Sequence, residues 1–304
     1  MKRFLKSTFF QFCFLALLCL LCLTAQAAEE KPYAVTTFEC IGIYHPSEDV
    51  GKCTPFYRKK GETDWRESLE LVYDPRDNEY RGSIVGLQPN AMYEIQLRSE
   101  NRKVDLECRT KSEDFPIGKT THLPKGTLDS PLEVTKSGTP DAYHLVTPHP
   151  GSKTTIDVGN AADCTVVVDA DYVILRGIEL KNAARHGILI ERGRHHVIIE
   201  DCHITFWGRI GGPITYGNVG NMDSAIYAET GVGNLVIQRN LIRDPRGASN
   251  DWDTGHPSGP QAISLRNSSG GNIIRYNEIL STEDHGFNDA IGGAGFPREI
   301  LGYE

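Results

Sequence analysis

Ionisable side chains suited to proton transfer gather in the second half of the sequence. The candidate catalytic residues are His186, Asp223, His285 and Asp289. Imidazole and carboxylate groups act as general acids and bases when their pKa lies near the working pH. The sequence therefore predicts an acid–base site, although a histidine in a turn can equally be a structural hydrogen-bonding group.

A second group of side chains could hold a substrate or a metal ion. The candidate substrate-binding residues are Arg185, Glu191, Tyr227, Glu229, His256 and Arg266, and the candidate metal ligands are Asp251 and Asp253. The guanidinium groups of Arg185, Arg209 and Arg266 would anchor an anionic group of a substrate. Tyr227 would either face a sugar ring or cover its own strand. The acidic segment at 251–253 would either bind Ca²⁺ or form a solvent-exposed loop.

Glu191 and Glu229 are expected to be neighbours on adjacent strands, about 4.8 Å apart. This separation is close to that of the carboxyl pair in a retaining glycosidase, and it suits a calcium site equally well. The plainer alternative is a surface ion pair between Glu229 and Arg266, in which Glu191 has no role.

Two types of short apolar segment recur together from residue 173 onward. The first type is VILRGIEL (173–180), VIIEDCHI (197–204), LVIQRNLI (235–242) and NIIRYNEI (272–279). The second type is GILIE (187–191), AIYAE (225–229), AISLR (262–266) and AIGGA (290–294). Segment types that advance together, with no helical stretch between them, are typical of one repeated structural unit. The pattern predicts a parallel β-solenoid, and the alternative is a coincidental similarity within an antiparallel sandwich.

Stacked coils bring equivalent residues of successive repeats next to each other. One expected apolar column is Ile188, Ile226, Ile263 and Ile291, and one expected turn column is Gly177, Cys202, Asn240 and Asn277. Stacked asparagines can pass side-chain hydrogen bonds from one coil to the next. Two glycine-rich insertions, at 208–224 and 244–260, fall at the same point of successive coils. They would wall a groove over the strands that carry the candidate residues.

The segment KGTLDSPLEVTKSGTPDAYHL, ahead of DYVILRGIEL, resembles the start of right-handed parallel β-helices in pectate- and alginate-lyase-like proteins of secreted bacterial systems. The resemblance spans roughly residues 120–304. It implies a polysaccharide substrate and, for a lyase, removal of the proton beside a uronate carboxylate that Ca²⁺ or a basic group holds. No full catalytic motif of a lyase family matches, so no catalytic role is transferred to any residue. DHG at 284–286 resembles a segment of pectin-degrading hydrolases without their accompanying aspartate motifs.

Residues 33–111 alternate apolar and polar side chains in short segments between turn-rich pieces, which predicts a small antiparallel β-sandwich. The segment GLQPNAMY, which ends at Tyr93, resembles a corner of fibronectin type III domains, and FYRKKGETDW, which ends at Trp65, is similar to their middle-strand region. In that family, the tyrosine hydroxyl bonds the backbone of the corner. The resemblance implies a fibronectin type III-like domain over 30–111 that serves as a spacer or an adhesion unit.

Residues 1–27 have the composition of a signal peptide, with a basic start, an apolar run and a small-x-small ending at Ala27. We therefore expect export to the periplasm, the cell surface or the extracellular medium, with no membrane span after cleavage. The formal net charge of −8 disfavours nucleic acid as a partner. Five cysteines come after the signal; the first three could supply one disulfide and the last two should be buried: Cys40, Cys53, Cys108, Cys164 and Cys202.

The sequence thus predicts an all-β chain with four parts. These are a signal peptide (1–27), a fibronectin type III-like domain (30–111), a linker and lead-in (112–130) and a right-handed parallel β-helix (131–304). No cap is recognisable after the last repeat, so we expect this β-helix to be truncated and to continue in a longer protein. The expected function is action on a polysaccharide, by a lyase in preference to a glycoside hydrolase, and the alternative is a non-catalytic glycan-binding or adhesion protein. Ca²⁺ is the expected cofactor if one is needed.

Overall fold

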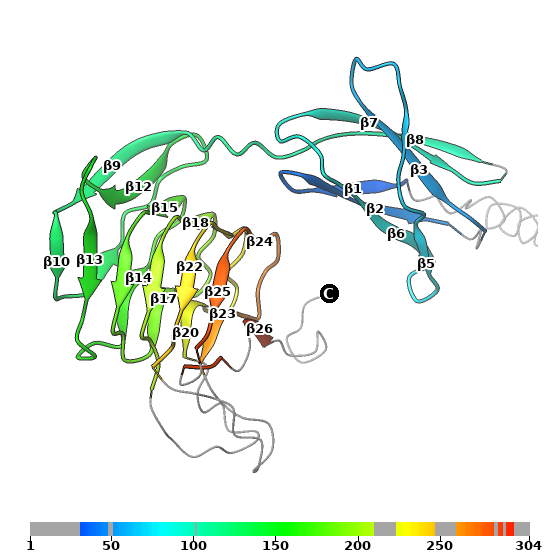
Figure 1. The fold of residues 1–304 in the computed structure, drawn as a ribbon. Helices are drawn as coiled ribbons and strands as arrows, with labels where there is room; N and C mark the ends of the chain where they lie inside the picture. The colour runs from blue at the N-terminus through cyan, green and yellow to red at the C-terminus, as the bar shows by residue number, and fades with distance from the viewer. Residues whose placement is uncertain are drawn as a thin grey trace, which may run out of the picture. The chain divides into compact units, whose positions relative to one another are not determined.

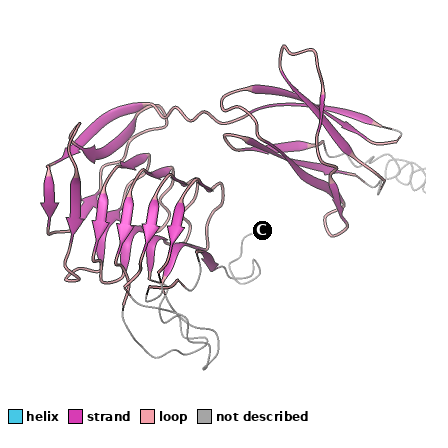
Figure 2. Ribbon diagram, viewed as in Figure 1, coloured by secondary structure: helices cyan, strands magenta, loops and turns pink. Residues whose placement is uncertain are grey.

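The computed structural model describes residues 31–47, 51–100, 102–209, 223–246, 260–282, 285–287 and 290–294. Within these ranges, β-strands are the only regular elements (Figures 1 and 2). The chain divides into two compact units, residues 1–113 and 114–304. The predicted signal peptide (1–27) lies outside the described residues. Across the described part of the chain, no helix is long and apolar enough to span a membrane.

The N-terminal unit is a sandwich of two four-stranded antiparallel sheets. One sheet has the order β1-β2-β6-β5, with bounds Tyr33–Thr36, Cys40–Pro46, Glu79–Val85 and Val72–Asp74. The other has the order β4-β3-β7-β8, with bounds Arg66–Glu67, Thr54–Lys59, Met92–Arg98 and Lys103–Arg109. Alternate residues of these strands, such as Ile41, Ile43 and Ile95, form a shared core. The antiparallel sandwich predicted from the alternating pattern is therefore present.

Tyr93 fixes the corner at the start of β7. Its side chain is buried, and its hydroxyl accepts a hydrogen bond from the Gln88 backbone N–H at 2.9 Å. Trp65 lies outside the core of the sandwich, and the guanidinium of Arg58 stacks over its ring at 4.5 Å. All five cysteines of the described residues are free, so the possible disulfide among Cys40, Cys53 and Cys108 is not formed, while Cys164 and Cys202 are buried as predicted.

The C-terminal unit is a parallel β-helix of three six-stranded sheets (Figure 1). The first sheet runs from β9 at Ile117–Leu123 through β12 (Tyr143–Pro148), β15 (Val173–Arg176), β18 (Val197–Glu200) and β21 (Val236–Gln238) to β24 (Ile273–Arg275). The second runs through β10 (Gly126–Leu128), β13 (Thr154–Asp157), β16 (Glu179–Lys181), β19 (His203–Thr205), β22 (Leu241–Arg243) and β25 (Glu278–Leu280). The third runs through β11 (Leu132–Val134), β14 (Cys164–Val168), β17 (His186–Ile190), β20 (Ser224–Ala228), β23 (Gln261–Arg266) and β26 (Ile291–Ala294).

The predicted apolar column is present in the third sheet. Ile188 pairs with Ile226, Ile226 with Ile263, and Ile263 with Ile291. The first three side chains are 0% exposed, whereas Ile291, in the last described strand, is 53% exposed. The stack of coils therefore forms one continuous apolar interior, as the repeated segments predicted.

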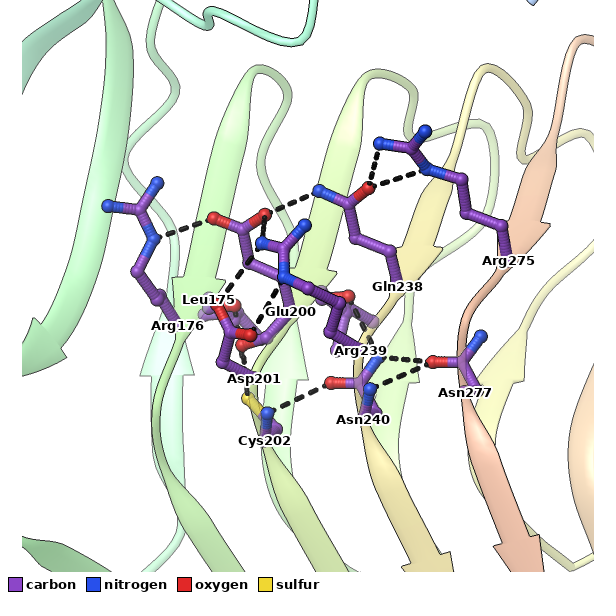
Figure 3. Close-up of polar contacts among 11 residues, drawn as sticks. Leu175, Arg176, Glu200, Asp201, Cys202, Gln238, Arg239, Asn240, Arg275 and Asn277 are labelled. Carbon is purple, nitrogen blue, oxygen red and sulfur yellow. Dashed lines mark hydrogen bonds and ion pairs between the residues drawn. The ribbon is translucent and has the colours of Figure 1, made fainter. Parts of the chain in front are cut away.

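The predicted turn column is present for Cys202, Asn240 and Asn277, and it carries hydrogen bonds between coils (Figure 3). The prediction was wrong for Gly177, which is level with Asp201 and not with Cys202. The Cys202 N–H donates to Asn240 Oδ1 at 3.0 Å, and the Asn240 N–H donates to Asn277 Oδ1 at 3.0 Å. Asn240 Nδ2 also donates to the Ile199 carbonyl at 2.9 Å. Each asparagine side chain thus replaces backbone partners that a turn leaves unpaired.

The β-helix begins earlier than the sequence pattern placed it. Strands β9 and β10 lie within residues 112–130, the predicted linker and lead-in, and they pair in parallel with β12 and β13. The pattern missed them because most side chains of β9 are exposed, which removes the apolar signal of a buried strand. The two long insertions, at 208–224 and 244–260, connect the second sheet to the third, and most of their residues lie outside the described ranges.

Candidate functional site

A pocket of about 210 Å³ lies over the third sheet. It combines three arginines with a histidine, a tyrosine, a cysteine, a leucine and two carboxylates; its described lining is Asp163, Cys164, Arg185, His186, Leu189, Arg209, Tyr227, Glu229 and Arg266. Arg185, His186, Tyr227, Glu229 and Arg266 were all candidates from the sequence. The structure therefore brings together residues that are dozens of positions apart in the chain.

The stacking of the third sheet explains this convergence. Asp163, Arg185 and Asp223 each stand just before a strand of that sheet, in three successive coils. Gly187 permits the close approach of the next coil, because a Cβ at this position would lie 2.5 Å from the Ala225 carbonyl oxygen. Side chains that precede these strands therefore meet where the N-terminal ends of the stacked strands lie side by side.

Asp223 is a buried anchor for the arginines. Its carboxylate is 0% exposed and accepts hydrogen bonds from Arg209 through Nε at 2.8 Å, Nη2 at 2.9 Å and the backbone N–H at 2.9 Å. Arg185 Nε lies 3.6 Å from the same carboxylate. A carboxylate engaged in this way orients guanidinium groups toward the pocket. Its position suits this role better than the proton transfer predicted for it.

His186 is held as a neutral hydrogen-bonding group. Its Nδ1 accepts a hydrogen bond from the Ser224 N–H at 3.1 Å, and its ring stacks on Tyr227 with 4.4 Å between centroids. Burial lowers the pKa of His186 to about 4, against the opposing effect of Asp223 and with the aid of Arg185 and Arg209. The Nδ1 lone pair is therefore occupied, and the proton of the neutral ring lies on Nε2. This arrangement disfavours His186 as the general base.

Tyr227 presents its hydroxyl, and not an open ring face, to the pocket. The ring is 5% exposed and is stacked against His186. The hydroxyl accepts a hydrogen bond from Arg266 Nη1 at 3.3 Å. This hydrogen bond fixes the position of the phenolic oxygen beside the Arg266 guanidinium. The hydroxyl and the guanidinium of Arg266 are therefore both available to a ligand in the pocket. Of the two alternatives for Tyr227, covering its own strand fits this burial, and stacking on a sugar ring does not.

The predicted carboxylate pair is only half present in the pocket. Glu229 lines the pocket, and its Oε2 accepts a hydrogen bond from the Thr230 N–H at 3.2 Å. Glu191 is its neighbour one coil earlier but is not among the described lining residues. Glu229 and Arg266, both described, form no ion pair with each other, because Arg266 bonds Tyr227 instead.

Two polar lining residues, Asp163 and Cys164, were not site candidates in the sequence analysis. Asp163 lies 3.8 Å from Arg185 and could have been found by extending the alignment of third-sheet strands one coil back to CTVVV at 164–168. Cys164 pairs in register with His186, and burial raises the pKa of its thiol to about 11. A thiol with this pKa is protonated at neutral pH, so Cys164 has no signature of a nucleophile.

The remaining candidates are elsewhere or lie outside the described residues. His285 donates from Nδ1 to the Pro245 carbonyl at 2.7 Å and stands edge-on to Phe206, away from the described pocket lining. The other four candidates lie outside the described residues: His256, Asp289, Asp251 and Asp253. Within the described ranges, no group of three His, Cys, Asp or Glu side chains is placed to hold a metal ion.

Comparisons with known proteins give a limited result. No protein-family model matches the chain. No curated protein matches it either. Among solved structures, the chain is similar to the pectate lyase PelI from Erwinia chrysanthemi in complex with tetragalacturonic acid. The match has 9% sequence identity and a TM-score of 0.24, and it covers 86% of this chain and 87% of that chain. A likeness at this TM-score supports no statement about the activity of this chain.

Proposed function

We propose that this chain is an exported carbohydrate-active protein whose β-helix binds an acidic polysaccharide and cleaves it as a lyase. The observation that carries the proposal is the convergence of Arg185, Arg209 and Arg266 on one pocket that also contains the Tyr227 hydroxyl. Guanidinium groups recognise carboxylates through paired hydrogen bonds. A uronic-acid polymer offers one carboxylate per sugar and therefore suits this lining.

The Tyr227–Arg266 pair supplies the chemistry that elimination requires. A base removes the proton on the carbon beside the uronate carboxylate, the neighbouring C–O glycosidic bond breaks, and a C=C bond forms. The electron pair of the broken C–O bond stays on the leaving oxygen, which takes the proton back from the protonated base, so atoms and charge balance. Tyr227 would act as the base, because it lines the pocket and Arg266 fixes the position of its hydroxyl, and Arg185 and Arg209 would neutralise the substrate carboxylate. The His186 ring would hold the ring of Tyr227 in place by stacking. Its Nε2–H would donate a hydrogen bond to the substrate, because Nδ1 already accepts from Ser224.

Hydrolysis is the second candidate, and one observation favours it. Asp163 and Glu229 both line the pocket, so two carboxyl groups are available for a general acid and a nucleophile or base. A non-catalytic glycan-binding role would use the same arginines without either reaction. Calcium, if it takes part, would bind the loop that contains Asp251 and Asp253.

The proposal extends to the N-terminal unit and to export. The bond from the Gln88 N–H to the Tyr93 hydroxyl supports a fibronectin type III-like sandwich over 30–111. The composition of residues 1–27 supports cleavage of a signal peptide.

The test uses the full chain with polygalacturonate, alginate and chondroitin sulfate, each with calcium and with a chelator. Absorbance from unsaturated uronate would support the lyase, new reducing ends without that absorbance the hydrolase, and binding alone the glycan-binding protein. Arg266→Ala should abolish activity, whereas Arg243→Ala, which removes a surface arginine paired with Asp244 on the second sheet, should not. If the chain neither binds nor cleaves any of these polymers, the proposal is wrong.

A further inference from the structure

A second pocket, of about 360 Å³, lies on the N-terminal unit, on the sheet formed by β4, β3, β7 and β8. Its lining is one indole, five polar or charged residues and two aliphatic residues: Arg58, Trp65, Glu94, Ile95, Gln96, Asp105, Leu106 and Glu107. None of these residues takes part in the β-helix site. A spacer module needs no such pocket.

The indole of Trp65 is held in a fixed orientation. The Arg58 guanidinium lies over the ring, with 4.5 Å between its central carbon and the ring centroid. Arg58 is itself held by Glu94, at 2.6 Å from Nε to Oε2. The aromatic group is therefore locked by a partly buried ion pair, so it loses little side-chain freedom when a ligand binds.

The polar groups of the pocket stand in cross-strand rows beside the indole. Glu94 pairs in register with Glu107, and Gln96 pairs with Asp105. Gln96 Oε1 accepts a hydrogen bond from Arg98 at 2.7 Å, which orients its amide NH₂ group as a donor. Carboxylate acceptors and an amide donor are thus presented on one rigid surface.

This combination recognises a carbohydrate of a different kind from the one proposed for the β-helix. The negative face of an indole attracts the polarised C–H groups of a sugar ring, and carboxylates accept hydrogen bonds from hydroxyl groups. Each carboxylate of the pocket is paired with a cation: Glu94 with Arg58 at 2.6 Å, Glu107 with Lys60 at 2.8 Å and Asp105 with Lys103 at 3.6 Å. The charges are therefore balanced, and the pocket has no net positive charge to attract a polyanion. We propose that the N-terminal unit is a binding module for a neutral polysaccharide, independently of what the β-helix does.

A purely structural role for the Arg58–Trp65 pair is the plain alternative. Arg98 stacks on Phe56 at 3.9 Å on the same sheet, so such a pair also occurs outside the lining of this pocket. The two alternatives predict different effects of removing the indole. A binding role predicts loss of affinity with the fold intact, and a structural role predicts loss of stability alone.

The test is affinity electrophoresis of the full chain in gels that contain xyloglucan, galactomannan, arabinoxylan or polygalacturonate. We expect retardation by at least one neutral polymer, and a loss of affinity of tenfold or more in Trp65→Ala. Asp105→Ala, at an exposed position, should weaken binding without any risk to the fold. Tyr33→Ala, which removes a 49% exposed aromatic group from the other sheet, should bind the neutral polymers as the wild type does.

Several outcomes would overturn the proposal. These are no retardation by any neutral polymer, equal retardation of the wild type and of a folded Trp65→Ala variant, or binding of oligolysine in place of the neutral polymers. Cleavage of polygalacturonate by a chain that ignores all neutral polymers would leave the β-helix proposal standing and remove this one.

Discussion

At the scale of single residues, different side chains of the pocket over the third sheet suit charge stabilisation and proton transfer. The Asp223 carboxylate is paired with Arg185 and Arg209. His186 is neutral, and its Nδ1 accepts a hydrogen bond from the Ser224 N–H. The Tyr227 hydroxyl is then the group best placed to exchange a proton, because Arg266 donates to it. The residue types in the pocket suggested a histidine base, and their hydrogen bonds favour a tyrosine.

Tyr227→Phe tests this assignment with a minimal change. The variant keeps the ring that stacks on His186 and removes only the hydroxyl. We expect the rate of uronate elimination to fall by roughly 10²–10⁴-fold, the usual share of general acid–base catalysis, with oligouronate binding retained. Calorimetric titration separates binding from turnover. Tyr172→Phe, at a tyrosine that stacks on His196 outside the pocket lining, should leave both unchanged.

His186 should also make the stability of the β-helix depend on pH. Its pKa falls from 6.5 to about 4 on folding, because burial disfavours the imidazolium. Between these pH values the unfolded chain binds the proton and the native chain does not, so the free energy of unfolding rises with pH. Below pH 4, stability should be lower by on the order of 3 kcal/mol than above pH 6.5.

Urea unfolding at several pH values measures this effect. His186→Asn retains an acceptor for the Ser224 N–H but cannot titrate, so its stability should change less between pH 4 and pH 6.5. The same pH dependence in the wild type and in the variant would assign the effect to other groups.

At the scale of elements, hydrogen-bonded columns link one coil to the next. Besides the asparagine ladder, Glu200 joins three coils, since its carboxylate accepts from Arg176 at 2.6 Å and from Gln238 Nε2 at 2.6 Å (Figure 3). Arg275 extends this row to a fourth coil by donating to Gln238 Oε1 at 2.9 Å. The turns are therefore held by side chains where the backbone ladder ends.

Asn240→Ala should destabilise the β-helix by about 2–4 kcal/mol. It would leave the Cys202 N–H and the Ile199 carbonyl without the partners that Asn240 provides, and each unpaired buried group costs about 1–3 kcal/mol. Asn277→Ala should cost less, because this residue is only half-buried. Denaturant unfolding monitored by circular dichroism gives both values, and a loss below about 0.5 kcal/mol at Asn240 would contradict the ladder's role.

The isoleucine column offers a comparison of one residue type in two environments. Ile226→Ala, at a side chain that is 0% exposed, should cost about 2–5 kcal/mol because it opens a cavity between Ile188 and Ile263. Ile291→Ala, at a side chain that is 53% exposed, should cost less than about 1 kcal/mol. Equal losses in chemical denaturation would mean that the column is not packed as described.

These columns show what the sequence could and could not predict. The repeated segments were sufficient for the parallel stack, for the Ile188–Ile226–Ile263 register and for the asparagine ladder, because each depends only on period. The first coil was missed at β9, where exposed side chains hide the strand. The hydrogen bonds that His186 and Asp223 make to Ser224 and Arg209 could not be predicted, because no spacing in the sequence encodes them.

At the scale of the whole molecule, the two units have separate cores. One core contains Ile95 and the other contains Ile226, and no residue belongs to both. Cooperative unfolding depends on a shared core, so each unit should unfold as its own cooperative transition. This separation matters for function, because the two proposed binding sites lie on different units.

Differential scanning calorimetry of two core variants tests this independence. Ile95→Ala should lower only the transition of the sandwich, by several degrees, because a loss of 1 kcal/mol shifts the midpoint of a domain of this size by about 4–8 °C. Ile226→Ala should lower only the transition of the β-helix. A single transition that moves in both variants would mean that the units are thermodynamically coupled. Binding of a neutral polymer to one unit would then stabilise the other, and the two sites could not be treated as independent.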